Sequence, residues 1–305
     1  MVGITAKIKP HLPMIFFIII LAIAAFIRFW AASISTGPDV SQFWAFAKVF
    51  RIHGLDFYGF AEAQLDIFPQ KGWGFFYPPV WLLILGLCFL ISPSTSATGS
   101  LIDSSWRLAV KTPIIAADLA IGCLLFWAVP GSKWRKLFFS SLWLLHPTAW
   151  FESGVFGQFD AVAAALLLAA VIFLLKGKDI LAFVFAALAV MTKQHTFFAV
   201  AMMLITGTRY LSKKRWLTNL TLMGGVAALL SIPFVVTGNF FPYLRALLAP
   251  GSLPGYQDPL CLSFSGLGAL LTQLNHVFGW NTNTLIVILS YLLIAGFLVT
   301  AALVY

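Results

Sequence analysis

Several polar residues interrupt stretches of this chain that are otherwise almost wholly apolar. The segment WFESGVFGQFDAV, residues 150–162, places Glu152, Gln158 and Asp160 between two apolar runs. Carboxylate and amide oxygens accept hydrogen bonds, so this segment could orient the hydroxyl groups of a sugar. The simpler alternative is a polar turn, in which glycines supply flexibility and Asp160 caps the next helix.

Asp39 is the first candidate for proton transfer. It follows Gly37 and Pro38 in STGPDVSQFW, where a first apolar helix is expected to leave a membrane. A carboxylate that is partly desolvated at such an interface has a tunable pKa and can act as a general base. The alternative role is that of a helix cap, because aspartate is a favoured N-cap residue.

Two positively charged residues are candidates for binding a phosphate. Lys193 belongs to the polar triplet Lys193-Gln194-His195, which interrupts an apolar stretch spanning residues 180–205. Ionisable residues at membrane depth usually mark function. Arg245 is the only basic residue of a long loop near the end of the chain, and arginine can bind phosphate oxygens in bidentate fashion. The alternatives are a lysine that snorkels to the interface and a surface arginine.

The sequence predicts neither a metal site nor a cofactor. No nucleotide-binding loop, zinc-ligand spacing or nucleophile elbow is present. Four of the histidines, His53, His146, His195 and His276, are too scattered along the chain to suggest a metal site.

Asp118 is the one carboxylate for which a structural role is expected. It lies well inside an apolar run, where an ionised group needs a partner. Arg28 and Lys111 are the candidate partners, since both also lie in apolar segments.

The composition indicates what kind of elements must position these side chains. Of the 305 residues 61% are hydrophobic and only 10% are charged, and the mean hydropathy is +0.95. A soluble protein would have roughly a quarter charged residues. The fold class is therefore an all-α, multi-pass membrane protein. The net charge of +9 comes from short basic clusters between apolar runs, which is typical of cytoplasmic loops and excludes nucleic acid as the expected partner.

The basic clusters also predict a topology. Together they contain 11 of the 19 basic residues and a single acid, Asp179, and the positive-inside rule places them in the cytoplasm: Lys7, Lys9, Lys133, Arg135, Lys136, Lys176, Lys178, Arg209, Lys213, Lys214 and Arg215. With a first helix over residues 12–35, only one crossing is then allowed before residue 133, although two apolar segments lie there. The shorter one, residues 77–92, is expected to be re-entrant or interfacial. The alternative is that it crosses and the charge rule fails at three loops.

We expect one domain over residues 1–305 with two long external loops. The first, residues 36–106, would carry interfacial helices, among them an amphipathic one over residues 40–53. The second loop covers residues 237–282. Residues 283–305 would begin a further helical part that is truncated, so that the chain is C-terminally incomplete.

Six short motifs, in this order, resemble the GT-C-type membrane glycosyltransferases, and most closely the dolichyl-phosphate-glucose-dependent glucosyltransferases of lipid-linked oligosaccharide assembly. They are GPDVSQFW, WGFFYPP at residues 73–79, Arg107 followed by AADL, FGQFDAV, TKQH and FFPYLRALL, and the likeness as a whole spans roughly residues 13–270. The chain departs from the family in having Phe156 where a histidine is usual, and it lacks a later His-Glu motif.

The resemblance implies a function and assigns roles. A hexose, glucose or mannose, would pass from a polyprenyl-phosphate-linked donor to a hydroxyl of a glycan or glycolipid acceptor, with inversion and without a metal or other cofactor. Asp39 would be the catalytic base, and Lys193 and Arg245 would stabilise the lipid phosphate. The sugars would be bound by Gln42, Trp44, Tyr77, Gln158, Asp160, Gln194 and His195.

The expected location is a bacterial or archaeal plasma membrane or the endoplasmic reticulum, with an extracytoplasmic or lumenal active site. Two other classes stay open. One is a secondary transporter or lipid flippase with Asp118, Lys193 and Asp160 as a coupling path. The other is a non-catalytic subunit of a glycan-assembly complex.

Overall fold

The computed structural model describes residues 11–70, 74–93 and 103–248, together with Leu292, Ala295, Gly296 and Val299. Within these residues the chain is helical and contains no strand. The first part comprises α2 (Leu12–Ile34), α3 (Pro38–His53), η1 (Gly54–Asp56), α4 (Phe57–Ala63), η2 (Leu65–Ile67), α5 (Pro79–Ile91) and α6 (Ser104–Ala128). The second comprises α7 (Lys133–Leu144), α8 (Pro147–Trp150), η3 (Phe151–Phe156), α9 (Asp160–Leu175), α10 (Asp179–Val190), η4 (Gln194–Thr196), α11 (Phe197–Tyr210), α12 (Lys213–Phe234), η5 (Val235–Asn239) and α13 (Phe240–Leu248).

Three helical runs in this part of the chain are long and apolar enough to cross a membrane. They cover Leu12–Ile34, Ser104–Ala128 and Lys213–Leu247, and shorter apolar helices cover Pro79–Ile91, Asp160–Leu175 and Asp179–Val190. Large apolar side chains remain exposed on these helices, such as Phe26 at 70% and Leu229 at 74%. Such surfaces are suited to lipid rather than water, so the composition and the helices agree on association with a membrane.

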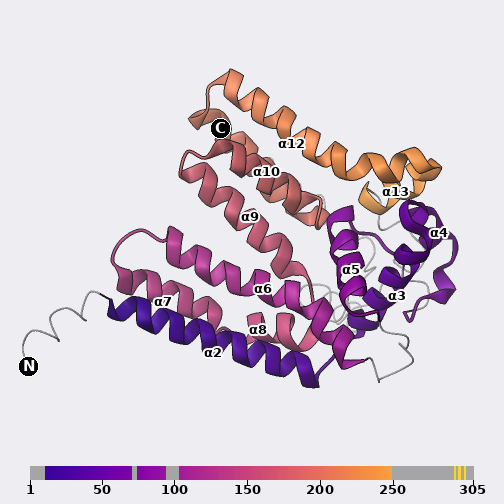
Figure 1. The fold of residues 1–305 in the computed structure, drawn as a ribbon. Helices are drawn as coiled ribbons and strands as arrows, with labels where there is room; N and C mark the ends of the chain where they lie inside the picture. Colours follow the sequence, from indigo (N-terminus) through magenta and orange to yellow (C-terminus); the bar gives the residue numbers. More distant parts are fainter. Residues whose placement is uncertain are drawn as a thin grey trace, which may run out of the picture.

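The helices α2, α6, α7, α9, α10, α11 and α12 form a bundle (Figure 1). The loops 129–132, 176–178 and 211–212 lie together at one end, which we call the basic end because all the positions from Lys133 to Arg215 in the basic clusters border these loops. The opposite end, on the right in Figure 1, carries α3, α4, α5 and α13 together with the starts of α6 and α9. We call it the site end.

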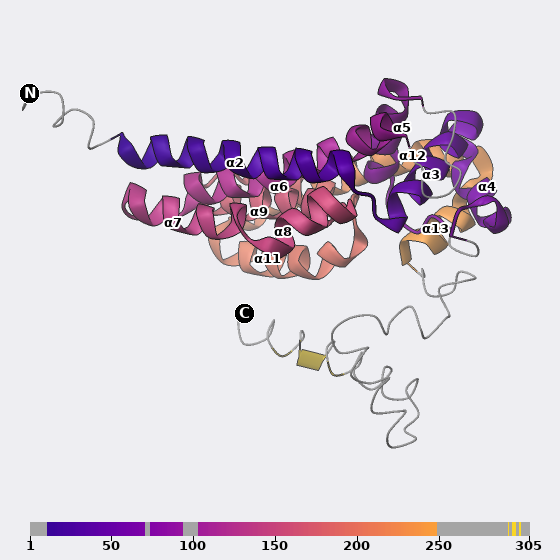
Figure 2. The ribbon, with the colours of Figure 1, turned by 90° about the horizontal axis from the view of Figure 1, so that it is seen from below.

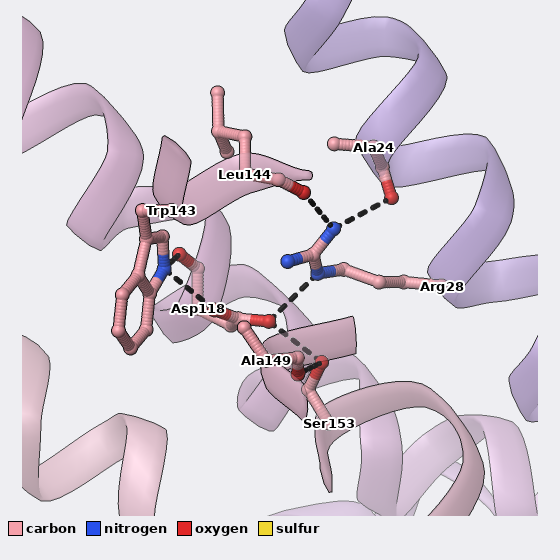
Figure 3. Close-up of polar contacts among 7 residues, drawn as sticks. All are labelled: Ala24, Arg28, Asp118, Trp143, Leu144, Ala149 and Ser153. Atoms are coloured by element: carbon pink, nitrogen blue, oxygen red, sulfur yellow. Dashed lines mark hydrogen bonds and ion pairs between the residues drawn. The ribbon is translucent and has the colours of Figure 1, made fainter. Parts of the chain in front are cut away.

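A buried ion pair joins the first helix to the interior of the bundle (Figure 3). Arg28 Nε donates to Asp118 Oδ2 over 2.7 Å, and both side chains are 1% exposed. Asp118 also accepts from Ser153 Oγ at 2.6 Å and from Trp143 Nε1 at 2.8 Å. The expectation that Asp118 has a charged partner inside the bundle is thus confirmed, and of the two candidates the partner is Arg28.

Lys111, the other candidate partner of Asp118, instead binds backbone carbonyl groups. Its ammonium group donates to the carbonyl oxygens of Ser35, Gly154 and Val155 at 2.8–2.9 Å, and the residue is fully buried. It therefore joins the end of α2 to η3, the two segments that precede Asp39 and Gln158.

Helix α3 differs from the flat amphipathic helix that was expected over residues 40–53. Besides Val40, Phe43 and Ala47, which share one helical face, α3 buries Ala45, Phe46 and Val49, because α4 and α5 pack against it as well as the bundle does. The described part of the 36–106 region is therefore a compact helical layer over the site end, which is visible in Figure 2.

Both ends of α5 contact bundle helices at the site end, namely the end of α10 and the start of α6. Val80 N donates to Met191 O at 3.0 Å, just after α10 ends. At the other end of α5, Ser92 bonds to Ser105 in the first turn of α6 at 2.7 Å. Contacts of both helix ends with the same end of the bundle are what we expect of a segment that does not cross the membrane. The position of α5 relative to a membrane stays a prediction.

Candidate functional site

Asp39 is placed in the first turn of α3 but does not cap it. The helix begins after Gly37, with Pro38 as its first residue, and no side chain caps it. Instead the half-buried Asp39 carboxylate accepts hydrogen bonds from two amides: Gln70 Nε2 at 3.1 Å and Gln158 Nε2, which binds the second oxygen. A carboxylate in the first turn is also stabilised by the helix dipole. Asp39 is therefore held in one orientation by two amide donors.

Gln70 connects Asp39 to the next predicted residue, Gln42. The buried Gln42 side chain accepts a hydrogen bond from Gln70 N through Oε1, at 2.9 Å. These three residues line a cavity of about 230 Å³, together with Phe76, Tyr77 and three others. Carboxylate, amide and aromatic groups facing one space are a set of groups that can bind a sugar.

Gln158 lies between this cavity and a second one. The second cavity, of about 240 Å³, is lined by Gln158, Glu152, His146 and the Asp118–Ser153 pair among others. Burial raises the pKa of the Glu152 carboxyl, and the nearby Asp160 and Asp39 carboxylates raise it further, whereas Lys193 lowers it. The predicted polar segment 150–162 therefore supplies walls to a cavity rather than only a turn.

Lys193 and Asp160 form a bidentate ion pair. Lys193 Nζ lies 2.7 and 2.8 Å from the two carboxylate oxygens, with the side chains 19% and 51% exposed. The ammonium group also lies 4.9 Å from the ring centroid of Phe159 and 6.0 Å from that of Tyr77. Lys193, predicted to bind phosphate, and Asp160, predicted to bind sugar, are thus paired with each other. The pair lies beside Tyr77, which lines the Asp39 cavity.

The neighbours of Lys193 have different environments. Gln194 Nε2 donates to the carbonyl of Phe76 at 2.7 Å, which ties η4 to the segment that lines the cavity. Gln194 Oε1 is buried and has no hydrogen-bond donor among the described residues. His195 is exposed; desolvation lowers its pKa, Lys193 lowers it further, and Asp160 opposes the shift.

The structure does not bring Arg245 to Asp39. Its guanidinium forms a bidentate pair with Glu62 of α4, at 2.7 and 2.9 Å, and is 47% exposed. Trp44 is half-buried against the aromatic core, and the ammonium of Lys48 lies 5.0 Å from its ring centroid. Both residues belong to the site end, but no described contact links either of them to the carboxylate of Asp39.

Two residues of this arrangement were not among the predicted site residues. Gln70 lies in an ordinary polar loop, and the only sequence signal was its position shortly before the WGFFYPP motif. Glu62 is one of five acids within residues 36–106, and its sequence surroundings have no distinguishing pattern. Both act through partners distant in sequence, so spacing alone could not have found them.

No group of three or more potential metal ligands occurs within the described ranges. No protein-family model, no curated protein and no solved structure matches this chain significantly. Functional inference therefore depends on the side chains of the site end.

Proposed function

We propose that this chain is a membrane glycosyltransferase, which transfers a hexose from a polyprenyl-phosphate-linked donor to a hydroxyl of a glycan or glycolipid acceptor. The main support is the half-buried Asp39 carboxylate, which two amide side chains orient beside a cavity at the site end. A fixed, partly desolvated carboxylate next to an aromatic and amide-lined space is suited to deprotonating a sugar hydroxyl.

The proposed reaction is a single displacement. Asp39 takes the proton of the acceptor hydroxyl while that oxygen forms a bond to the anomeric carbon of the donor. The bond between the anomeric carbon and the phosphate oxygen breaks, and the polyprenyl phosphate leaves with its electron pair. The anomeric configuration is inverted because attack and departure occur on opposite faces.

The leaving phosphate needs positive charge near it. Lys193 is the nearer candidate, because its ammonium lies beside the Tyr77 ring that lines the Asp39 cavity. An arriving phosphate would compete with Asp160 for this ammonium. Arg245 would take part only by leaving Glu62 or by binding a phosphate in addition to it. Such preorganised charges stabilise the transition state electrostatically.

The sugar contacts follow from the walls of the two cavities. Gln42 and Gln158 present amide groups, Tyr77 presents a ring, and Gln194 holds the Phe76 segment in place. His195 and Trp44 would contact the parts of the substrates that extend beyond the cavity. The active site would lie on the extracytoplasmic or lumenal side, opposite the basic end.

The transporter alternative has less support. A coupling path needs a carboxylate that can gain and lose its partner during transport. Asp118 instead has an arginine, a serine and a tryptophan as simultaneous donors in a fully buried position. Removing such a partner would leave a buried charge unpaired, which is strongly unfavourable.

The deciding experiment is sugar transfer by the purified protein in liposomes. The donor is a short-chain polyprenyl-phosphate glucose or mannose, and the acceptor is an extracted pool of lipid-linked glycans. We expect the Asp39→Asn variant to lose at least about a hundredfold in rate, the usual contribution of a general base, while its thermal unfolding in detergent stays close to wild type.

The matched control is Asp66→Asn, which removes an exposed carboxylate from η2 in the same region. It should transfer sugar at the wild-type rate. Unchanged transfer by Asp39→Asn would exclude Asp39 as the base. No transfer by the wild-type protein with any donor would favour the transporter or the assembly subunit.

A further inference from the structure

A large cavity lies at the basic end of the bundle, away from the proposed active site. Its volume is about 580 Å³, within the roughly 300–1,000 Å³ of small-molecule sites. Helices α9 and α11 supply its apolar walls, and we call the cavity the α9–α11 groove. The wall residues are Val171, Leu174, Leu175, Ala199, Met202 and Met203. An apolar groove between two apolar helices is suited to a hydrocarbon chain.

The mouth of the groove is polar and positively charged. It is formed by Thr206, Tyr210 and Arg215, where α11 ends and α12 begins. Tyr210 is 73% exposed, as expected for a tyrosine at a membrane–water interface. Five further basic residues lie within two positions of a lining residue: Lys176, Lys178, Arg209, Lys213 and Lys214.

Arg215 is suited to binding an anion at this mouth. Its side chain is 63% exposed and uses Nη2 to donate to Asp179 Oδ1 at 2.7 Å. Asp179 also accepts from Asn219 at 2.7 Å, so the only acid of these loops is already engaged. The amino end of the 22-residue helix α12 adds partial positive charge at the same place.

We infer that the α9–α11 groove binds a diacyl phospholipid with an anionic headgroup. One acyl chain would lie along Met202 and Met203, and the headgroup phosphate would bind Arg215. Charge complementarity identifies this occupant: an anionic lipid brings net negative charge to the basic mouth, whereas a zwitterionic lipid also brings a cationic group that the basic side chains would repel. The inference concerns the opposite end of the bundle from Asp39 and does not depend on the proposed transferase activity.

The test is competition between two lipids for the purified full chain. The protein in detergent is incubated with equimolar phosphatidylglycerol and phosphatidylcholine of identical acyl chains, and the retained lipid is identified by native mass spectrometry. We expect wild type to retain phosphatidylglycerol in excess by about fivefold, which corresponds to about 1 kcal/mol for one charged contact near the surface.

Two variants break the same ion pair and have opposite expected results. Arg215→Gln removes the proposed phosphate ligand, and the lipid ratio should fall to about one. Asp179→Asn also removes the ion pair but keeps Arg215 and an acceptor for Asn219, so the preference should stay at or above the wild-type value. If both variants lose the preference, the ion pair rather than a lipid contact is responsible and the inference is wrong.

Two further variants separate the groove from general attraction. Met202→Trp fills the apolar wall and should reduce retention of both lipids. Arg135→Gln removes an exposed charge at the basic end but outside the groove, and it should leave the ratio unchanged. Equal retention of the two lipids by wild type, or a loss with Arg135→Gln as large as with Arg215→Gln, would overturn the proposal.

Discussion

At the scale of single residues, the three charged candidates of the site end, Asp39, Lys193 and Arg245, already have partners. Asp39 accepts from two amides, Lys193 is held by Asp160, and Arg245 is held by Glu62. The ammonium of Lys193 and the guanidinium of Arg245 pair with carboxylates other than that of Asp39. The separation of Asp39 from Lys193 and Arg245 therefore suits a base on one side of a reaction and cations on the other.

Replacing Gln158 tests how much the orientation of Asp39 matters. Gln158→Leu removes one of its two amide donors, and a hydrogen bond to a charged group contributes about 1.5–3 kcal/mol. We therefore expect the rate of sugar transfer to fall about tenfold or more, together with a lower melting temperature because the same bond stabilises the fold. The control is Gln64→Leu, which removes an exposed amide just after α4. Wild-type transfer by Gln158→Leu would show that this bond plays no part in catalysis.

The raised pKa of the Glu152 carboxyl predicts that the stability of the protein depends on pH. Its pKa is raised in the folded protein, first by burial and then by Asp160 and Asp39. Between the unfolded and the folded pKa the folded state holds more protons, so the free energy of unfolding falls as pH rises through that window. The destabilisation is absent below the unfolded pKa and fully present above the folded one.

The variant Glu152→Gln removes this titration. Its melting temperature in detergent should exceed that of wild type at pH 7, and the difference should shrink as the pH falls towards 4, near the ordinary glutamate pKa. Melting temperatures measured at half-unit intervals of pH give the comparison. Two parallel curves would contradict the inferred environment of Glu152.

At the scale of elements, the site depends on a close crossing between two chain segments. Gly37, just before α3, lies against the backbone of η3, so that an added Cβ would overlap the carbonyl oxygen of Phe156. Lys111 reinforces this crossing through Ser35, Gly154 and Val155. The crossing is what brings Asp39 within reach of Gln158, from 119 positions away in the chain.

Gly37→Ala should disturb both stability and activity. Its overlap is with backbone, which cannot move aside as a flexible side chain would, and overpacking of this kind typically costs about 1–3 kcal/mol. We expect a lower melting temperature together with slower transfer, because Asp39 must shift with the loop. Gly224→Ala is the matched control, since nothing lies within 4 Å of the added carbon there. It should be neutral or stabilising by about 1 kcal/mol. If both variants melt alike, the crossing is not tightly packed.

The sequence predicted the helices and several members of the site because both left local signals. Apolar length indicated α2 and α6, and a charge inside an apolar run singled out Asp118 and its partner Arg28. The pairing of Arg245 with Glu62 left no such signal. Two surface-type residues 183 positions apart meet only because α13 packs on α4, and that packing depends on the whole tertiary arrangement.

At the scale of the whole molecule, the two ends of the bundle differ in charge. The basic end has a single acid, Asp179, among the described residues, whereas Asp39, Glu62, Glu152 and Asp160 lie at the site end. Basic loops are retained in the cytoplasm, so this polarity predicts which end faces which compartment. It also predicts that the α9–α11 groove and the candidate active site lie on opposite sides of the membrane.

The orientation of α5 decides whether this assignment is consistent. Because both ends of α5 contact the site end, we expect its last residues on the same side as α4. After Cys88, Cys123 and Cys261 have been replaced by alanine, single cysteines can be introduced one at a time for labelling with a membrane-impermeant maleimide. The positions are Pro93→Cys after α5, Gln64→Cys after α4 and Gly177→Cys in a basic loop.

In sealed vesicles of one orientation, the cysteines at positions 93 and 64 should react from the same side and the one at position 177 from the other. At 13 residues and a rise of 1.5 Å per residue, α5 is about 20 Å long, which is short for a hydrocarbon core of about 30 Å. If α5 instead crosses the membrane, the cysteine at position 93 should react from the side opposite to position 64, and the one at position 177, which follows the crossings of α6, α7 and α9, should react from the same side as position 64. The parity of all later helices would then reverse, and Asp39 and Lys193 would no longer face one compartment, which would remove the basis for a shared active site.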